Sequence, residues 1–237
     1  MEHLLTEIVE RLQKAHGDKL VSVVLYGSAV APGGRDALSD FNILCVLKQV
    51  TPDELHEAEP VFRWWREMKN PSPLLLSSDE VRNSTDSFPI EFEDMRAQHQ
   101  VLFGEDVISG LTIGASFYRA QVEHELRAKL IRLRQKAGGI LSDRELLLQL
   151  MAGSISTFCV LFRHALRIAG DRPVFDKREI VKAARERFGI DAAPFDTILD
   201  LREEKTKPKS VANPAELLRS YLHEIVTVVK AVDRMAH

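Results

Sequence analysis

Two short apolar runs separated by a turn-rich connection place the strongest limit on how this chain can fold. The run LVSVVLYG at 20–27 is β-branched and ends at a glycine, and FNILCVLK at 41–48 is the second run. Apolar runs of this length are typical of strands buried inside a sheet. The connection APGGRDALS carries a Gly-Gly pair, which favours a turn. We therefore predict a sheet with both strands in its interior.

Further elements surround these strands in the first half of the chain. The N-terminal segment 1–12 has apolar residues at helical spacing and reads as an amphipathic helix rather than a signal peptide. Thr51 and Pro52 suit the cap and first position of a second helix, with a disturbance expected at Pro60. The segment SPLLLSS at 72–78 predicts a third strand.

The segment FPIEFEDMRAQHQVLFG at 88–104 fits two structures. As a strand it would place Glu91 and Glu93 on one face. As a helix it forms one apolar stripe, and the stripe favours the helix; its members are Phe88, Phe92, Met95, His99 and Leu102. A short strand at 101–104 is expected to follow.

The second half is helical almost throughout. We predict four helices that form a bundle: one over 116–139, one capped by Ser142 that ends near Gly170, one capped by Asp176, and one from Pro214 to the end. The predicted fold class is therefore α+β, with a mixed sheet flanked by helices in residues 1–112 and an α-helical bundle in residues 113–237.

Composition excludes several classes of protein. The chain has 237 residues, 45% of them hydrophobic, and a formal net charge of −3, so it lacks the basic excess of a nucleic-acid-binding protein. The uncharged stretch at 146–162 is interrupted by polar residues and glycine, which favours a central bundle helix over a membrane span. We expect no membrane or nucleic acid partner.

The two cysteines indicate where the protein resides. Cys45 and Cys159 both lie inside apolar runs. Buried free thiols in a reducing compartment are the expectation, which predicts a cytoplasmic protein.

A known family shares the pattern at residues 23–47. A strand that ends in YGS, a connection of about a dozen residues and an SD pair that opens the next strand resemble the nucleotidyltransferase superfamily. The aminoglycoside nucleotidyltransferases and the small MNT-type proteins are the most similar members. The resemblance implies a nucleotidyltransferase-like sheet, a C-terminal helical bundle, a nucleoside triphosphate and Mg²⁺.

The motif has a physical logic. Gly27 permits a tight turn and close approach of a phosphate, to which Ser28 would offer its hydroxyl and N–H. Residues 40 and 42 share one face of a strand, where two carboxylates would hold Mg²⁺ against the triphosphate. A third acid on a neighbouring strand completes such a site in the family.

This sequence departs from the family pattern at two places. Position 42 is Asn42, whose amide oxygen can coordinate Mg²⁺ but brings no charge, and the third strand carries leucines at 74–76. Asp79 and Glu80 follow in an expected helix cap, and Glu91 could substitute only from a strand. We therefore expect a degenerate acidic motif in which the Mg²⁺ site is weak or absent.

Each candidate residue also has a structural alternative. Gly27 and Ser28 could form a plain turn with a serine cap, and Asp40 could cap the preceding loop instead of holding a metal. Asn42 could bond to a loop rather than a metal. Arg35 could reach a triphosphate or stay solvated.

The bundle supplies the candidates for a general base. Aminoglycoside nucleotidyltransferases take the acceptor's proton with a bundle carboxylate, so the resemblance points to Glu123 or Glu125. The alternative is a surface ion pair with Arg127 or Lys129 along the helix.

Two functional hypotheses follow. The first is a protein that binds a nucleotide, with transfer to a hydroxyl weakened or lost. The second is an active nucleotidyltransferase that modifies a small molecule or a protein, and an antitoxin-like regulatory partner is a further alternative. An exposed apolar strip on the bundle would indicate a homodimer.

Overall fold

The computed structural model describes residues 2–30 and 41–235, which fall into two compact units, Met1–Phe117 and Tyr118–His237. In the described part of the first unit, four strands form one mixed sheet in the order β3-β2-β1-β4. β1 is antiparallel to β2 and β4, and β2 is parallel to β3. The elements are α1 Glu2–His16, η1 Gly17–Lys19, β1 Leu20–Tyr26, η2 Gly27–Val30, β2 Asn42–Leu47, α2 Pro52–Glu67, β3 Leu74–Ser77, α3 Ser78–Asn83, α4 Pro89–Ala97 and β4 His99–Gly104.

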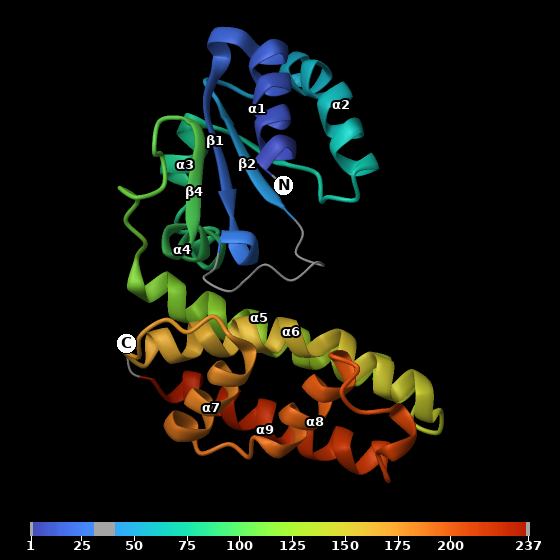
Figure 1. Ribbon diagram of the computed structural model, residues 1–237. Helices are drawn as coiled ribbons and strands as arrows, with labels where there is room; N and C mark the ends of the chain where they lie inside the picture. The colour runs from blue at the N-terminus through green and yellow to red at the C-terminus, as the bar shows by residue number, and fades with distance from the viewer. Residues whose placement is uncertain (1, 31–40, 236–237) are drawn as a thin grey trace. The chain divides into compact units, whose positions relative to one another are not determined.

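Helices cover both faces of this sheet (Figure 1). On one face, alternate residues of β1 and β2 pack against α1 and α2; they include Val23, Leu25, Ile43, Cys45, Ile8, Leu12, Val61 and Trp65. On the other face the intervening residues pack against α3 and α4; they include Val24, Leu44, Val46, Val81, Phe92 and Met95. The two predicted strands are therefore the two central strands, and their continuous apolar character is explained by burial on both sides.

Local signals set the limits of the helices beside the sheet. Thr51 caps α2 in a capping box with Glu54, and Ser77 caps α3 in the same way with Glu80. The disturbance predicted at Pro60 is absent, since α2 is continuous through it. Pro60 is exposed, so water can satisfy the carbonyl that loses its helical hydrogen bond.

The segment 88–104 combines both structures considered for it. α4 is a helix, as predicted, but it ends at Ala97, and the strand begins at His99 rather than at residue 101. The inclusion of His99 and Leu102 in the helical stripe was therefore wrong. Pairing with β1 from Tyr26 to Ser22 draws these residues into the sheet.

The second unit is a bundle of five helices within its described residues, rather than the four predicted. They are α5 Ala115–Gly138 (which starts just before the unit), α6 Arg144–Ile168, α7 Lys177–Phe188, α8 Ala193–Arg202 and α9 Pro214–Arg234, with a short η3 Pro208–Ser210. The unpredicted α8 buries Phe195, Ile198 and Leu199 in the core. Asp143, not Ser142, caps α6, because its carboxylate accepts from the N–H groups of Glu145 and Leu146.

α6 is the central helix of the bundle and packs against α7, α8 and α9. By length and composition it is the one helix in the described residues that could cross a membrane. Its core-facing side chains, from Leu147 to Leu166, are buried within the bundle.

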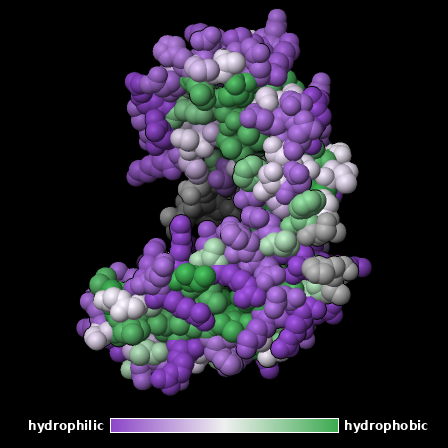
Figure 2. All heavy atoms as spheres, turned by 180° about the vertical axis from the view of Figure 1, so that it is seen from behind, coloured by the Kyte–Doolittle hydropathy of each residue, from purple (hydrophilic) through white to green (hydrophobic). Residues whose placement is uncertain are grey.

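Some apolar surface stays uncovered on the bundle. Figure 2 shows apolar atoms on one face of this unit, and its exposed large apolar side chains are Ile131, Leu141 and Leu146. They lie around the connection between α5 and α6. The homodimer stays a prediction.

Candidate functional site

Gly27 forms a tight turn where β1 ends and η2 begins. Its φ is +83°, a conformation that favours glycine, and a Cβ at this position would lie 3.2 Å from Asn42 Nδ2. The Gly27 N–H donates to the carbonyl of Gln98 at 3.3 Å. The peptide that precedes β4 therefore holds the turn by a hydrogen bond, and the Asn42 amide lies beside it.

A row of three polar side chains crosses the sheet beside this turn. Tyr26 pairs with Asn42 on β2 and with His99 on β4. Directly paired residues on neighbouring strands point to the same face, and this is the face covered by α3 and α4. Sequence reasoning missed Tyr26 and His99 as members of the site, although the alternation of Val24 and Tyr26 along β1 gives the face of the tyrosine.

Tyr26 keeps its proton at this position. Burial of the phenol raises its pKa above the ordinary value, and the negative charge of Glu91 adds to the shift. Glu91 itself is exposed in the first turn of α4. From sequence, Glu91 could be the third metal-binding acid only if it lay on a strand. Because Glu91 lies on the helix α4, it does not have this role.

The described residues do not fit Mg²⁺. β3 carries Leu74, Leu75 and Leu76, and Leu74 pairs with Leu44, which puts it on the Asn42 face. Glu80 is occupied in the cap of α3. Within residues 2–30 and 41–235, no group of three His, Cys, Asp or Glu side chains could hold a metal ion. Asn42 contributes one neutral amide oxygen, which is too little for a hard divalent cation.

Three sequence candidates fall partly or wholly outside the described residues. These are Arg35, Asp40 and the side chain of Ser28. The backbone of Ser28 belongs to η2, a 3₁₀ helix of four residues. Gly27 and Asn42 are thus the two predicted site residues that the structure brings together.

Glu123 and Glu125 both lie on α5 and both form ion pairs. Glu123 accepts from Arg127 at 2.8 Å and from Arg119 at 2.9 Å, and the hydrogen bond from Arg127 is the main cause of its lowered pKa. A carboxylate held in this way is a weak proton acceptor. Glu125 lies 3.3 Å from Lys129. The ion pairs considered from sequence are present, and the role as a base stays a prediction.

The mixed sheet with helices on both faces, followed by a helical bundle, is the nucleotidyltransferase fold. Among solved structures, the chain matches the spectinomycin adenyltransferase AAD(9) of Enterococcus faecialis, which was crystallised with ATP and spectinomycin. The TM-score is 0.62 at 14% sequence identity, over 98% of this chain and 99% of the other. No protein-family model and no curated protein matches the sequence. The likeness confirms the predicted fold class, α+β with a nucleotidyltransferase-like sheet.

Proposed function

We propose that this protein binds a nucleoside triphosphate at the Gly27 turn, and that its Mg²⁺-dependent transfer of a nucleotidyl group to a hydroxyl is weakened or lost. The fold supports the nucleotide, because the neighbour of known structure was crystallised with ATP. The positive φ of Gly27 supports this turn as the position of the phosphates, since a backbone without a Cβ lets phosphate oxygens approach the N–H groups.

A single observation carries the proposed loss of transfer. The side chain that packs against the Gly27 turn from β2 is the neutral amide of Asn42, and the matching face of β3 presents Leu74. A triphosphate with its metal ions needs several anionic oxygens from the protein. Asp40 is the one remaining carboxylate of the motif, and one charge neutralises little of the charge on two divalent ions.

Without a metal ion, the phosphates of the nucleotide would be held by groups of the protein alone. Backbone N–H groups at the turn would pair with phosphate oxygens, and the protonated phenol of Tyr26 is a hydrogen-bond donor in the same row of residues. Arg35 and Ser28 stay candidates for further phosphate contacts. A cytoplasmic location stays part of the proposal, and the free thiols of Cys45 and Cys159 support it.

Thermal unfolding with ATP or GTP, each with and without Mg²⁺, tests the proposal. A binder that has lost the metal site is stabilised by nucleotide regardless of Mg²⁺, by about 2.7 kcal/mol when the nucleotide is present at a hundred times its Kd. Inorganic triphosphate should give part of this shift, because the contacts are with phosphates. No shift with either nucleotide contradicts the proposal.

An active transferase is the second candidate, and the match over the whole length of an adenyltransferase favours it. It would modify a small molecule or a protein, with Asp40 and Asn42 at the metal and Glu125 as the less constrained of the two bundle carboxylates. A stabilisation by ATP that strictly requires Mg²⁺ would support this candidate over the first. An antitoxin-like role as a regulatory partner stays a prediction.

A further inference from the structure

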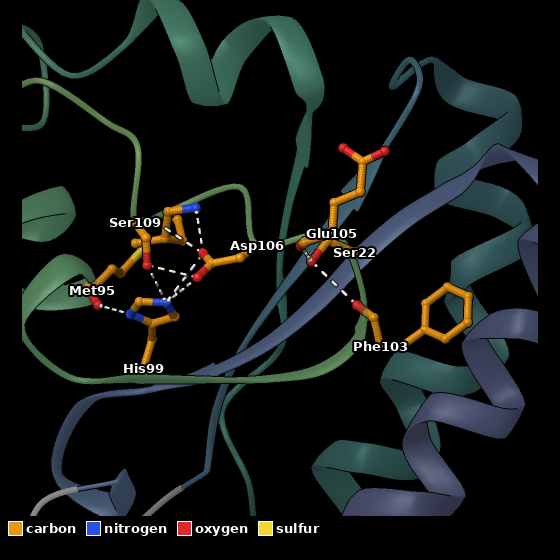
Figure 3. A network of polar contacts seen from close by, with 8 residues as sticks. Ser22, Met95, His99, Phe103, Glu105, Asp106 and Ser109 are labelled. Carbon is orange, nitrogen blue, oxygen red and sulfur yellow. Dashed lines mark hydrogen bonds and ion pairs between the residues drawn. The ribbon is translucent and has the colours of Figure 1, made fainter.

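The imidazole of His99 lies between two hydrogen-bond acceptors (Figure 3). Its Nδ1 is 2.8 Å from the carbonyl oxygen of Met95 in α4, and its Nε2 is 3.2 Å and 3.4 Å from the two carboxylate oxygens of Asp106. The ring is 11% exposed. His99 thus connects the end of α4 to the segment that follows β4.

Asp106 is held in place as an ionised carboxylate. It accepts from the Ser109 hydroxyl at 2.6 Å and from the N–H groups of Ser109 and Ile108 at 3.0 Å each. These hydrogen bonds, the one from the Ser109 hydroxyl first, hold the pKa of Asp106 well below its usual range.

β1 anchors the residue next to Asp106. The Glu105 N–H donates to the Val21 carbonyl at 3.3 Å, and the Ser22 hydroxyl donates to the Glu105 carbonyl at 2.6 Å (Figure 3). Ser22 is fully buried in the sheet. The residue next to Asp106 is therefore hydrogen-bonded to β1, the central strand that Gly27 follows.

This arrangement suits a doubly protonated imidazole. A carbonyl oxygen and an ionised carboxylate can only accept, so both ring nitrogens must carry hydrogen for both bonds to form. The Ser109 hydroxyl, 3.5 Å from Nε2, is much closer to Asp106. The other titratable or charged groups on the surrounding elements are Tyr26 on β1, Glu91, Glu93, Asp94 and Arg96 on α4, and Glu105 after β4.

The bonds of His99 lie on either side of the peptide that fixes the Gly27 turn. Gln98 is the one residue between α4 and β4; its N–H donates to the Asp94 carbonyl at 3.0 Å, and its carbonyl accepts from Gly27 at 3.3 Å. His99 follows directly and bonds back to Met95 and forward to Asp106. The two contacts of the His99 ring therefore lie before and after the Gln98 carbonyl along the chain.

We propose that His99 is a positioning residue that holds the Gln98 carbonyl on Gly27 and so orders the turn for a nucleotide phosphate. The nucleotide part rests on the proposed function. The role depends on the hydrogen bond between the His99 ring and the Asp106 carboxylate, so a variant that weakens this bond should loosen the turn and lower the affinity for ATP.

The test replaces the carboxylate with its amide in the full-length protein. Asp106→Asn keeps an oxygen that can accept from the N–H groups of Ile108 and Ser109, but it removes the negative charge that faces the His99 ring. Asp176→Asn is the matched control, because it makes the same chemical change at the cap of α7, where asparagine caps equally well. Two quantities are measured: hydrogen exchange of the Gly27 amide without ligand, and the Kd for ATP without metal.

We expect Asp106→Asn to accelerate Gly27 exchange and to weaken ATP binding by about tenfold, as for the loss of one charge-assisted hydrogen bond. Asp176→Asn should match the wild type in both measurements.

Two results would overturn the inference: an unchanged Gly27 exchange rate in Asp106→Asn, or an unchanged Kd for ATP in this variant although the exchange is faster. If the wild type binds no ATP, the proposed function fails, while the Gly27 exchange rates still decide whether His99 holds the turn.

Discussion

The side-chain amide of Asn42 packs directly against Gly27, so closely that a methyl group at position 27 would come within 3.2 Å of Asn42 Nδ2. The first residue of one central strand thus lies beside the residue that follows the other. A side chain at position 27 would require the Asn42 amide to move by a few tenths of an ångström.

Gly27→Ala should destabilise the protein by about 1–2 kcal/mol, because an L-residue pays this cost at a positive φ, and should weaken ATP binding as the turn shifts. Urea unfolding measures the first effect and a thermal shift with ATP the second. Gly153→Ala on α6 is the control, since a Cβ there meets nothing within 4 Å and alanine in a helix is favoured by about 0.5–1 kcal/mol. Equal stability of the two variants would contradict the prediction.

Asn42→Asp should tighten binding of Mg²⁺ by about tenfold, because it adds a carboxylate to a site that has an amide. Calorimetric titration with MgCl₂ alone measures the effect. Asn213→Asp adds the same charge at the cap of α9, where aspartate serves equally well, and should leave Mg²⁺ affinity unchanged. If Asn42→Asp behaves like this control, residue 42 does not face the metal position.

Leu74→Glu should restore part of the missing negative charge when it is combined with Asn42→Asp. Leu74 is 39% exposed, so the substitution alone should change stability by less than about 0.5 kcal/mol. The gain in Mg²⁺ affinity of the double variant should exceed the sum of the single gains, because the two carboxylates share one ion.

The control for this coupling is Leu55→Glu on α2, where the leucine is 52% exposed. Combined with Asn42→Asp, it should give only the gain of the single variant. Additive behaviour of the Leu74 double variant would place residue 74 away from the ion.

Acid should destabilise the first unit through His16. The ring is buried, its Nε2 has no hydrogen-bond partner among the described residues, and burial lowers its pKa below 6.5 even though Glu57 lies 3.3 Å from Nδ1. The unfolded chain therefore binds a proton at a pH where the folded chain does not, and stability falls as pH drops below about 6.5. Glu57 adds a second loss of stability below about pH 4.5, because its hydrogen bond with Lys19 lowers its pKa in the folded protein.

His16→Leu should remove the first of these two losses, because leucine fills the buried position without a titrating group. Chemical unfolding at several pH values between about 5 and 7 measures the slope. His56→Gln is the control, since His56 is largely exposed and should not alter the slope. An unchanged slope in His16→Leu would show that another group titrates.

The parts of the fold that follow from local chemistry could be predicted from sequence. Two helix caps are formed by residues close in sequence: Thr51 pairs with Glu54 in α2, and Asp176 accepts from N–H groups of α7. The continuous apolar runs of β1 and β2 likewise indicate that both strands are buried. The end of α4 could not be predicted, because the helical spacing of Met95, His99 and Leu102 continues past Ala97. Pairing with β1, far away in sequence, ends the helix.

The candidate site also combines residues that a local motif predicts with residues that only strand pairing brings in. The motif predicts Gly27 and Asn42, and the structure brings them together. The place of His99 beside Tyr26 depends on the register between β1 and β4, which shifts by one residue opposite Val23 and Val24. A register is a non-local property, so no pattern within the segment 88–104 indicates that its histidine pairs with Tyr26.

Each unit encloses one of the chain's two cysteines, Cys45 in the sheet and Cys159 in α6, and burial raises the pKa of both thiols to about 12. Neither can react with an alkylating reagent until its own unit opens. The protein therefore contains a built-in pair of reporters, one for each half, whose rates of labelling would show whether the two halves open together or separately.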